Sequence, residues 1–200
     1  ALAEEYQQIA QHGLQLQVDC PDLAMGRHTK WSDLSEKDFL DVARCNVAAL
    51  NQALQHVPVE QVRVHVCWGN YAGPHHQDMS AELLWPLLGE VKAKYLLMEG
   101  ANPRHRADVQ CFEEAVKKGY FKSHQVIVPG LIDTTTARVE DPRLIAESLL
   151  RYARAAGHPA RVIASTDCGF ASTARSTAIT ADLAWMKLQS LKAGAQLATR

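Results

Sequence analysis

The sequence has no excess of charge of either sign. Its 21 Lys and Arg residues balance 22 Asp and Glu residues, which leaves a formal net charge of −1 with histidine counted neutral. A chain with this balance has no strong electric field to attract a nucleic acid or an anionic membrane. We therefore expect neither a nucleic-acid partner nor a membrane partner.

The sequence also lacks long apolar runs and a targeting segment. No hydrophobic run approaches the roughly 20 residues that span a bilayer. The first residues, ALAEEYQQIAQHG, do not combine a basic start with a following apolar stretch, as a signal peptide does. The five cysteines form an odd, irregularly spaced set, which does not predict a disulfide framework. We expect a cytoplasmic protein whose cysteines are core thiols or ligands.

What the sequence does contain is an alternation of short β-rich runs with amphipathic stretches. The five runs, rich in Val, Ile and Leu, cover residues 14–20, 62–68, 94–100, 125–133 and 161–170. Helices are expected over residues 36–54, 80–92, 142–157 and 182–198. Buried strands that alternate with helices predict βαβ units and a parallel sheet. No linker or low-complexity segment interrupts the chain, so we expect a single domain over residues 1–200.

The ends of three predicted strands carry residue types that bind zinc. His65 and Cys67 lie two residues apart, so both side chains should point to one face of their strand. Glu99 ends the third run and Cys168 ends the fifth. In a parallel barrel these ends converge at one rim, and imidazole, thiolate and carboxylate are all normal zinc ligands.

Each of these residues, taken alone, also fits a structural role. His65, Cys67 and Cys168 fit buried core positions, and a Glu at a strand end is commonly solvated or salt-bridged. Glu99, however, follows the apolar segment KYLLM, and burial of an unpaired carboxylate is costly. A bound cation would supply the missing partner, so the combination favours a metal site.

Five motifs extend over almost the whole chain: QVDCPDLAM, HVCWGNYAGPHH, MEGANPRH, VPGLIDTTTARVEDP and ASTDCGF. In these motifs and their order, the chain resembles the C-terminal catalytic barrel of the cobalamin-independent methionine synthases, especially their short, single-barrel methionine synthase II-like relatives. The resemblance implies an α/β fold of the (β/α)8 TIM-barrel type, of which this chain supplies about the last five βα units. The N-terminal strands would then be missing, so we expect a further segment or a homo-oligomer to complete the barrel.

The resemblance also implies a cofactor and a reaction. The zinc ligands of the family carry over onto His65 and Cys67 in the HxC motif, Glu99 at the next strand end and Cys168 in DCG. They imply Zn²⁺ and a methyltransferase that activates a small-molecule thiol, homocysteine, for methylation to methionine. A methylfolate is one candidate methyl donor.

One departure from the family concerns proton transfer. Thr135, in LIDTTTA, stands where the family has a His that acts as general acid for the folate leaving group. Threonine cannot perform this proton transfer at neutral pH. Two alternatives therefore stay open: a zinc-dependent thiol alkyltransferase with another thiol or electrophile, similar to the epoxyalkane–coenzyme M transferases, and a non-catalytic zinc-binding relative.

Six further residues are predicted to bind substrate: Asp19, Trp68, Asn70, Asn102, Arg104 and Asp167. Asp19 matches the strand-end Asp of the family's QxDEP motif, and capping of the following turn is the alternative. Arg104 suits a substrate carboxylate or a surface ion pair. Asp167 suits the orientation of a ligand or the binding of a substrate amine.

Two structural roles fit Trp68, and two roles fit a pair of neighbouring histidines. Trp68 and Asn70 belong to the WGN segment, and Trp68 fits either a wall of the site or packing below it. His75 and His76 fit a solvated role or a position beside the ligands, because four better ligands are already present.

Overall fold

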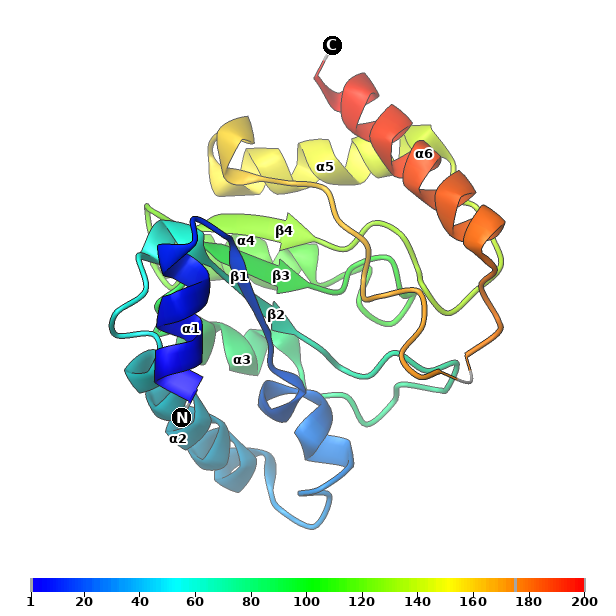
Figure 1. Ribbon diagram of the computed structural model, residues 1–200. Helices are drawn as coiled ribbons and strands as arrows, with labels where there is room; N and C mark the ends of the chain where they lie inside the picture. Colours follow the sequence, from blue (N-terminus) through cyan, green and yellow to red (C-terminus); the bar gives the residue numbers. More distant parts are fainter. Residues whose placement is uncertain (1, 175, 200) are drawn as a thin grey trace.

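The computed structural model describes residues 2–174 and 176–199, and a parallel β-sheet lies at its centre (Figure 1). The strand order is β1-β2-β3-β4, and every neighbouring pair is parallel. The strands are β1 (Leu16–Asp19), β2 (Val62–Val66), β3 (Tyr95–Met98) and β4 (Val126–Pro129). The α-helices are α1 (Leu2–Gln11), α2 (Glu36–Ala53), α3 (Ala81–Leu88), α4 (Val109–Lys117), α5 (Pro142–Ala156) and α6 (Ala181–Ala198). Short 3-10 helices cover Pro21–Leu23, Met25–His28, Val59–Gln61 and Pro159–Arg161.

The alternating direction of the side chains along β2 separates the hydrophobic core from the site. On β2, Val62, Val64 and Val66 are fully buried in the main core, which also contains Phe39 of α2 and Phe112 of α4. Successive side chains of a strand point to opposite faces, so His65 lies on the other face of the sheet. The carboxyl ends of the strands, and the loops that follow them, gather at one edge of the molecule (Figure 1).

The fifth predicted strand, over residues 161–170, pairs with β4 only at isolated positions. Bridges join Ile127 to Val162 and Gly130 to Ser165. The Ser165 N–H donates to Pro129 O at 3.1 Å, so the segment runs parallel to β4 and extends the sheet. It leaves β4 at Asp167, whose N–H donates to Ile132 O at 2.9 Å. Within residues 2–174 and 176–199, the sheet therefore has four strands and one extended, bridged segment.

Capping residues mark the helix boundaries that the sequence predicts. The side chains of Ser35, Asp141 and Thr180 accept N–H groups at the first turns of α2, α5 and α6. Gly157 ends α5 with φ of 78°, a left-handed conformation that glycine adopts without a steric penalty. These local signals place three of the four predicted helices within a few residues of their observed ends.

Two differences from the prediction concern α3 and α4. The helix expected over residues 80–92 ends at Leu88, because the chain continues as tight turns in which Glu90 N–H donates to Leu87 O and Val91 N–H to Leu88 O. Helix α4 was not predicted from the sequence. Its apolar residues Val109, Phe112 and Ala115 recur at steps of three and are buried, as an amphipathic helix requires.

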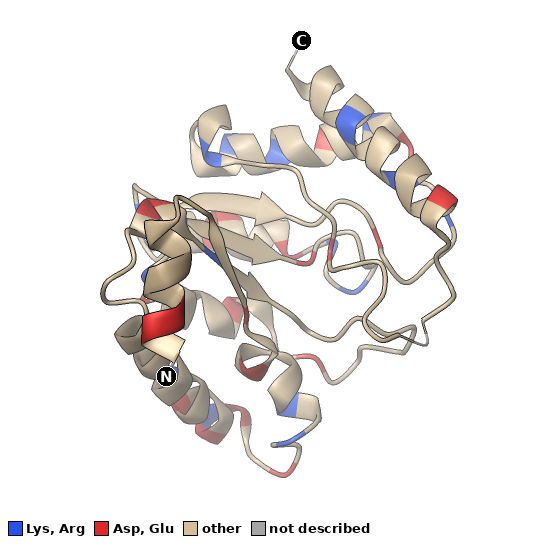
Figure 2. Cartoon of the chain, viewed as in Figure 1, with Lys and Arg blue, Asp and Glu red and all other residues tan. Residues whose placement is uncertain are grey.

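The charged residues do not form a surface of one sign. Acidic and basic residues are both spread over the helices and loops (Figure 2). No helix within the described residues is long and apolar enough to cross a membrane.

Helix α5 lies next to β4, and α6 packs closely against α5 (Figure 1). A Cβ atom at Gly194 of α6 would lie 2.5 Å from Cγ2 of Ile145 and 2.9 Å from the carbonyl oxygen of Pro142, both on α5. Any larger residue at position 194 must therefore push the two helices apart.

We expect Gly194→Val to lower the free energy of unfolding by about 2 kcal/mol, because overpacking of a filled contact costs this order of energy. The measurement is denaturant unfolding followed by circular dichroism. Gln196→Val, at an exposed position of the same helix, is the matched control and should change stability little. Combining Gly194→Val with Ile145→Ala should cost less than the sum of the single changes, and full additivity would contradict this account.

Candidate metal centre

Residues from three separate segments meet at the carboxyl edge of the sheet. His65 lies on β2, Cys67 follows this strand directly, and Glu99 follows β3. Cys168 follows the bridged segment beside β4. His65, Cys67 and Glu99 are less than one-tenth exposed, so the site is closed to bulk water on these sides.

The distances between the candidate ligand atoms fit a single small cation. The Sγ atoms of Cys67 and Cys168 are 3.7 Å apart, and Cys168 Sγ lies 4.0 Å from His65 Nε2 and 3.9 Å from Glu99 Oε1. In a tetrahedral zinc site with Zn–S bonds of about 2.3 Å, two sulfurs are about 3.8 Å apart. Cys67, Glu99 and Cys168, whose ligand atoms lie within 4.8 Å of one another, therefore have the chemistry and spacing of a zinc site, and His65 lies next to Cys168.

Two acceptors hold the ring of His65. Its Nδ1 lies 2.7 Å from Asp19 Oδ1, and its Nε2 lies 2.9 Å from the carbonyl oxygen of Asp167. Burial is the largest single effect and lowers the pKa of His65, but the hydrogen bond and charge of Asp19, together with Cys67 and the Asp167 carbonyl, outweigh burial, so the pKa is raised. A carboxylate on the far nitrogen of a histidine is the usual way to orient a metal ligand, which gives Asp19 a positioning role.

The two cysteines share a proton. The hydrogen bond that Cys67 accepts from Cys168 outweighs burial and lowers the pKa of Cys67 to about 6, and the Gly69 N–H also donates to Cys67 Sγ at 3.3 Å. The same hydrogen bond, together with burial, raises the pKa of Cys168. The pair therefore releases its first proton readily and its second with difficulty.

The carboxyl groups beside the sulfurs also resist ionisation. Burial raises the pKa of Glu99 to about 8, and the charge of Asp167 adds to this shift. Burial likewise raises the pKa of Asp167 to about 6, although three backbone N–H groups stabilise its ionised form. A divalent cation bound between these acidic groups would stabilise their ionised forms.

Asp167 is an anchor for the loop after β3. Its Oδ1 accepts the N–H groups of Gly100 and Ala101, both at 2.9 Å, and its Oδ2 accepts the N–H of Asn102 at 2.8 Å. A Cβ atom at Gly130 would lie 2.1 Å from Asp167 Oδ1, so only glycine leaves room for this carboxylate. The observed contacts of Asp167 are with the backbone of the chain itself.

Trp68 lies beneath the site and has no exposed surface. Its backbone N–H donates to Glu99 Oε1 at 2.9 Å, and its indole N–H donates to the carbonyl oxygen of Met79 at 2.7 Å. Of the two roles that the sequence leaves open for Trp68, the structure has the packing role.

Asn70 and Asn102 organise loops at the rim. The amide nitrogen of Asn70 donates to Gly169 O at 2.8 Å, and its amide oxygen accepts the hydroxyl of Thr134 at 2.8 Å. The Asn102 side chain accepts the N–H of Arg104 at 3.0 Å within a turn. Thr135 donates its hydroxyl to Asp133 Oδ1 at 2.7 Å, so this hydroxyl is already engaged.

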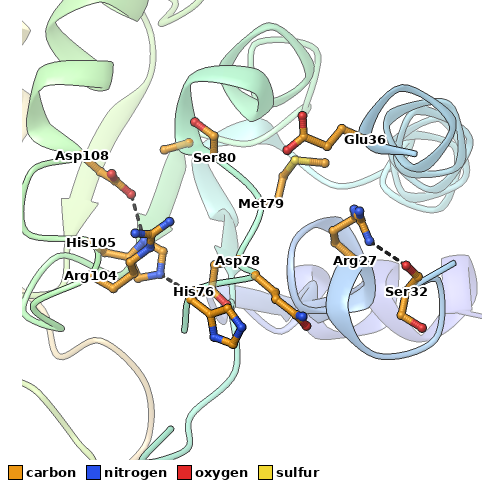
Figure 3. Close-up of a pocket in the computed structure, with 12 residues that line it drawn as sticks. Arg27, Ser32, Glu36, His76, Asp78, Met79, Ser80, Arg104, His105 and Asp108 are labelled. Atoms are coloured by element: carbon orange, nitrogen blue, oxygen red, sulfur yellow. Dashed lines mark hydrogen bonds and ion pairs between the residues drawn. The ribbon is translucent and has the colours of Figure 1, made fainter. Parts of the chain in front are cut away.

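Arg104 faces a neighbouring cavity of about 620 Å³ (Figure 3). Residues of the loops after β1, β2 and β3 line this cavity, among them Arg27, His76, Asp78 and His105. The cavity lining does not include Cys67, Glu99 or Cys168. Arg104 and the sulfur ligands therefore belong to adjacent but separate parts of the rim.

The structure contains a second cluster of titratable residues, His75, Asp78 and His105, that the sequence analysis did not predict. His76 is exposed, but the solvated role considered for His75 is wrong, because His75 is 3% exposed and packs near Asp78 and His105. The sequence does contain a signal for this cluster: HHQD and HRAD each hold a His three residues before an Asp. In both, the His ring bonds to that Asp, with N···O distances of 2.8 Å for His75 and 2.9 Å for His105.

Comparisons with known proteins agree with this architecture. Residues 1–189 match the model of a family described as cobalamin-independent synthase, catalytic domain. The structure is similar to that of a B12-independent methionine synthase from Shewanella sp. W3-18-1 in complex with selenomethionine, with a TM-score of 0.70 and 19% sequence identity. The match covers 98% of this chain and 52% of the other, so this chain spans about half the length of that relative. No curated protein matches the sequence.

The predicted α/β fold of TIM-barrel type is confirmed, and the chain belongs to the cobalamin-independent synthase catalytic-domain family.

Proposed function

We propose that this chain carries the zinc site of a methyltransferase that methylates a thiol, with homocysteine as the thiol and methionine as the product. The observation that carries the proposal is the convergence of Cys67, Cys168 and Glu99, beside His65, at one end of a parallel sheet. Membership of the cobalamin-independent synthase family supports the class of reaction. This chain would contribute about five βα units to one catalytic barrel.

The proposed cofactor is Zn²⁺, held by His65, Cys67, Glu99 and Cys168. When bound, zinc lowers the pKa of a substrate thiol, which then reacts as a thiolate near neutral pH.

The residues around the ligands keep the donor set in place. Asp19 holds the His65 ring, the Trp68 N–H holds Glu99, and the Gly69 N–H stabilises negative charge on Cys67. Asp167 fixes the loop after β3 next to Glu99. Such preorganisation keeps the reacting groups in line without reorganisation during the reaction.

The chemistry at the methyl donor is less constrained. The substrate sulfur forms a new S–C bond while the bond between the methyl carbon and the donor atom breaks, and the donor atom keeps that electron pair. A poor leaving group needs a proton from a general acid at this moment. Because the Thr135 hydroxyl is bonded to Asp133, the site favours a donor whose leaving group needs no such acid.

A second candidate function follows from the same observation. A related alkyltransferase that uses another thiol or another carbon electrophile would need the zinc ligands but not the acid histidine. A non-catalytic zinc-binding relative would keep the ligands and bind no thiol at the metal.

Replacement of either sulfur ligand, in Cys67→Ser or Cys168→Ser, should abolish both zinc retention and thiol methylation. Loss of a residue that merely orients a metal ligand costs about 10–100-fold in metal affinity, so loss of a direct ligand should cost more than about 100-fold. The measurement is elemental analysis after dialysis, together with a methylation assay. The exposed Cys45 provides the control Cys45→Ser. Stoichiometric zinc in either ligand variant would refute the assignment.

Removal of the histidine partner tests the positioning role of Asp19. We expect Asp19→Ala to weaken zinc binding about 10–100-fold and to leave the fold intact, because this side chain is 62% exposed. Competition with a chelator measures the affinity. Asp33→Ala removes another exposed carboxylate as a control. Equal zinc affinity in the two variants would show that Asp19 does not orient His65.

The choice between the functions can be made with a cobalt-substituted protein. Homocysteine should change the sulfur-to-cobalt charge-transfer absorption as its sulfur joins the metal, and incubation with a methyl donor should then yield methionine. A change with homocysteine but no methionine from methylfolate, while another electrophile is consumed, would favour the alkyltransferase. If no thiol alters the spectrum, both enzyme functions are wrong.

A further inference from the structure

A second group of metal-binding side chains lies between the loops after β2 and β3. Ligand atoms of His75, Asp78 and His105 all lie within 4.8 Å of one another. Asp78 Oδ2 is 2.8 Å from His75 Nδ1 and 2.8 Å from His105 Nε2. All three side chains are at most 4% exposed.

His28, from the loop after β1, approaches the same carboxylate without bonding to it. Its Nδ1 lies 3.3 Å from Asp78 Oδ1, and its side chain is 9% exposed. Both ring nitrogens of His28, and Oδ1 of Asp78, are buried and have no hydrogen-bond partner among the described residues. Burial of a polar atom without a hydrogen-bond partner is unfavourable, so these three atoms favour an occupant at this position.

The hydrogen bonds of the cluster suit exchange with a cation. The two nitrogens of His75 face Asp78 and the carbonyl oxygen of Tyr71, and those of His105 face Asp78 and Asp108. The ring nitrogens that face Asp78 are therefore placed where a divalent ion could take the position of the hydrogens that they share with its carboxylate.

We propose that His75, Asp78 and His105 bind a divalent transition-metal ion at a site distinct from the sulfur ligands, with the His28 ring at the edge of the group as a further ligand. Three imidazoles and one carboxylate, without sulfur, suit ions such as Zn²⁺, Fe²⁺, Co²⁺ or Ni²⁺. A metal with bonds of about 2.1 Å holds neighbouring ligand atoms about 3.0–3.4 Å apart. The observed separations of 2.8 and 3.3 Å are close to this range.

The ion has a route to this site and a structural role there. Asp78 and His105 form part of the wall of the 620 Å³ cavity, which the exposed His76 also lines (Figure 3). The four ligands come from the loops that follow β1, β2 and β3. A single ion would therefore join three of the loops that surround the sulfur site. The His105 ring also packs against Trp68, with 4.6 Å between the ring centroids.

The test uses Co²⁺ alone with the full chain carrying Cys67→Ser and Cys168→Ser, which removes the sulfur site. This protein should still bind one Co²⁺ per chain, with visible absorption bands but without sulfur-to-cobalt charge transfer. Adding Asp78→Asn should lower the Co²⁺ affinity at least about 100-fold. Adding His76→Gln instead, an exposed neighbour in the same loop, is the matched control and should leave the affinity unchanged.

The outcome is independent of the function proposed for the sulfur site, since both cysteines are absent from this protein. If the double cysteine variant binds no more Co²⁺ than the same protein with Asp78→Asn, the second site is wrong, and water or protons would then occupy the positions beside the His28 nitrogens.

If Asp78→Asn does not fold, as judged by circular dichroism, His28→Phe serves in its place. It removes one imidazole, keeps an apolar ring of similar size, and should weaken Co²⁺ binding about 10-fold or more. Undiminished Co²⁺ affinity in His28→Phe would count against the proposal.

Discussion

The burial of acidic groups at one edge of a parallel sheet is the constraint on which this structure depends. Ligand atoms of Cys67, Glu99 and Cys168 lie within 4.8 Å of one another, and burial raises the pKa of Glu99 and of the neighbouring Asp167. Ionised groups of like charge are costly in a region of low dielectric unless hydrogen bonds or a cation stabilise them. The loops around them supply backbone N–H donors, and the donor set itself has the composition of a zinc site.

The backbone of the rim is shaped by these same groups. Asp167 gathers three consecutive N–H groups of the loop after β3, and Gly130 leaves the space that its carboxylate fills. The N–H of Trp68 is used in the same way by Glu99. Side chains that a sequence comparison would assign to substrate are therefore engaged in fixing the loops that carry the ligands, which is how a site on loops acquires a defined geometry.

Two chemically different clusters share one structural support. The sulfur-containing cluster contacts Trp68 through the backbone, and the histidine-rich cluster contacts its ring. The ring is completely buried, so close packing fixes its position between the two clusters. The loop after β2, which holds Cys67, Trp68, His75 and Asp78, therefore connects the geometry of both clusters.

The sequence alone determined the features that depend on near neighbours. The apolar runs of β2, β3 and β4, the capping residues Ser35 and Asp141, and the same-face spacing of His65 and Cys67 all follow from interactions within a few residues. Only the tertiary structure decided the partners of the polar side chains. His65 bonds to a carbonyl 102 residues away, and Trp68 to a carboxylate 31 residues away. Such pairs form where the chain returns across the sheet, and local periodicity contains no information about which polar groups then meet.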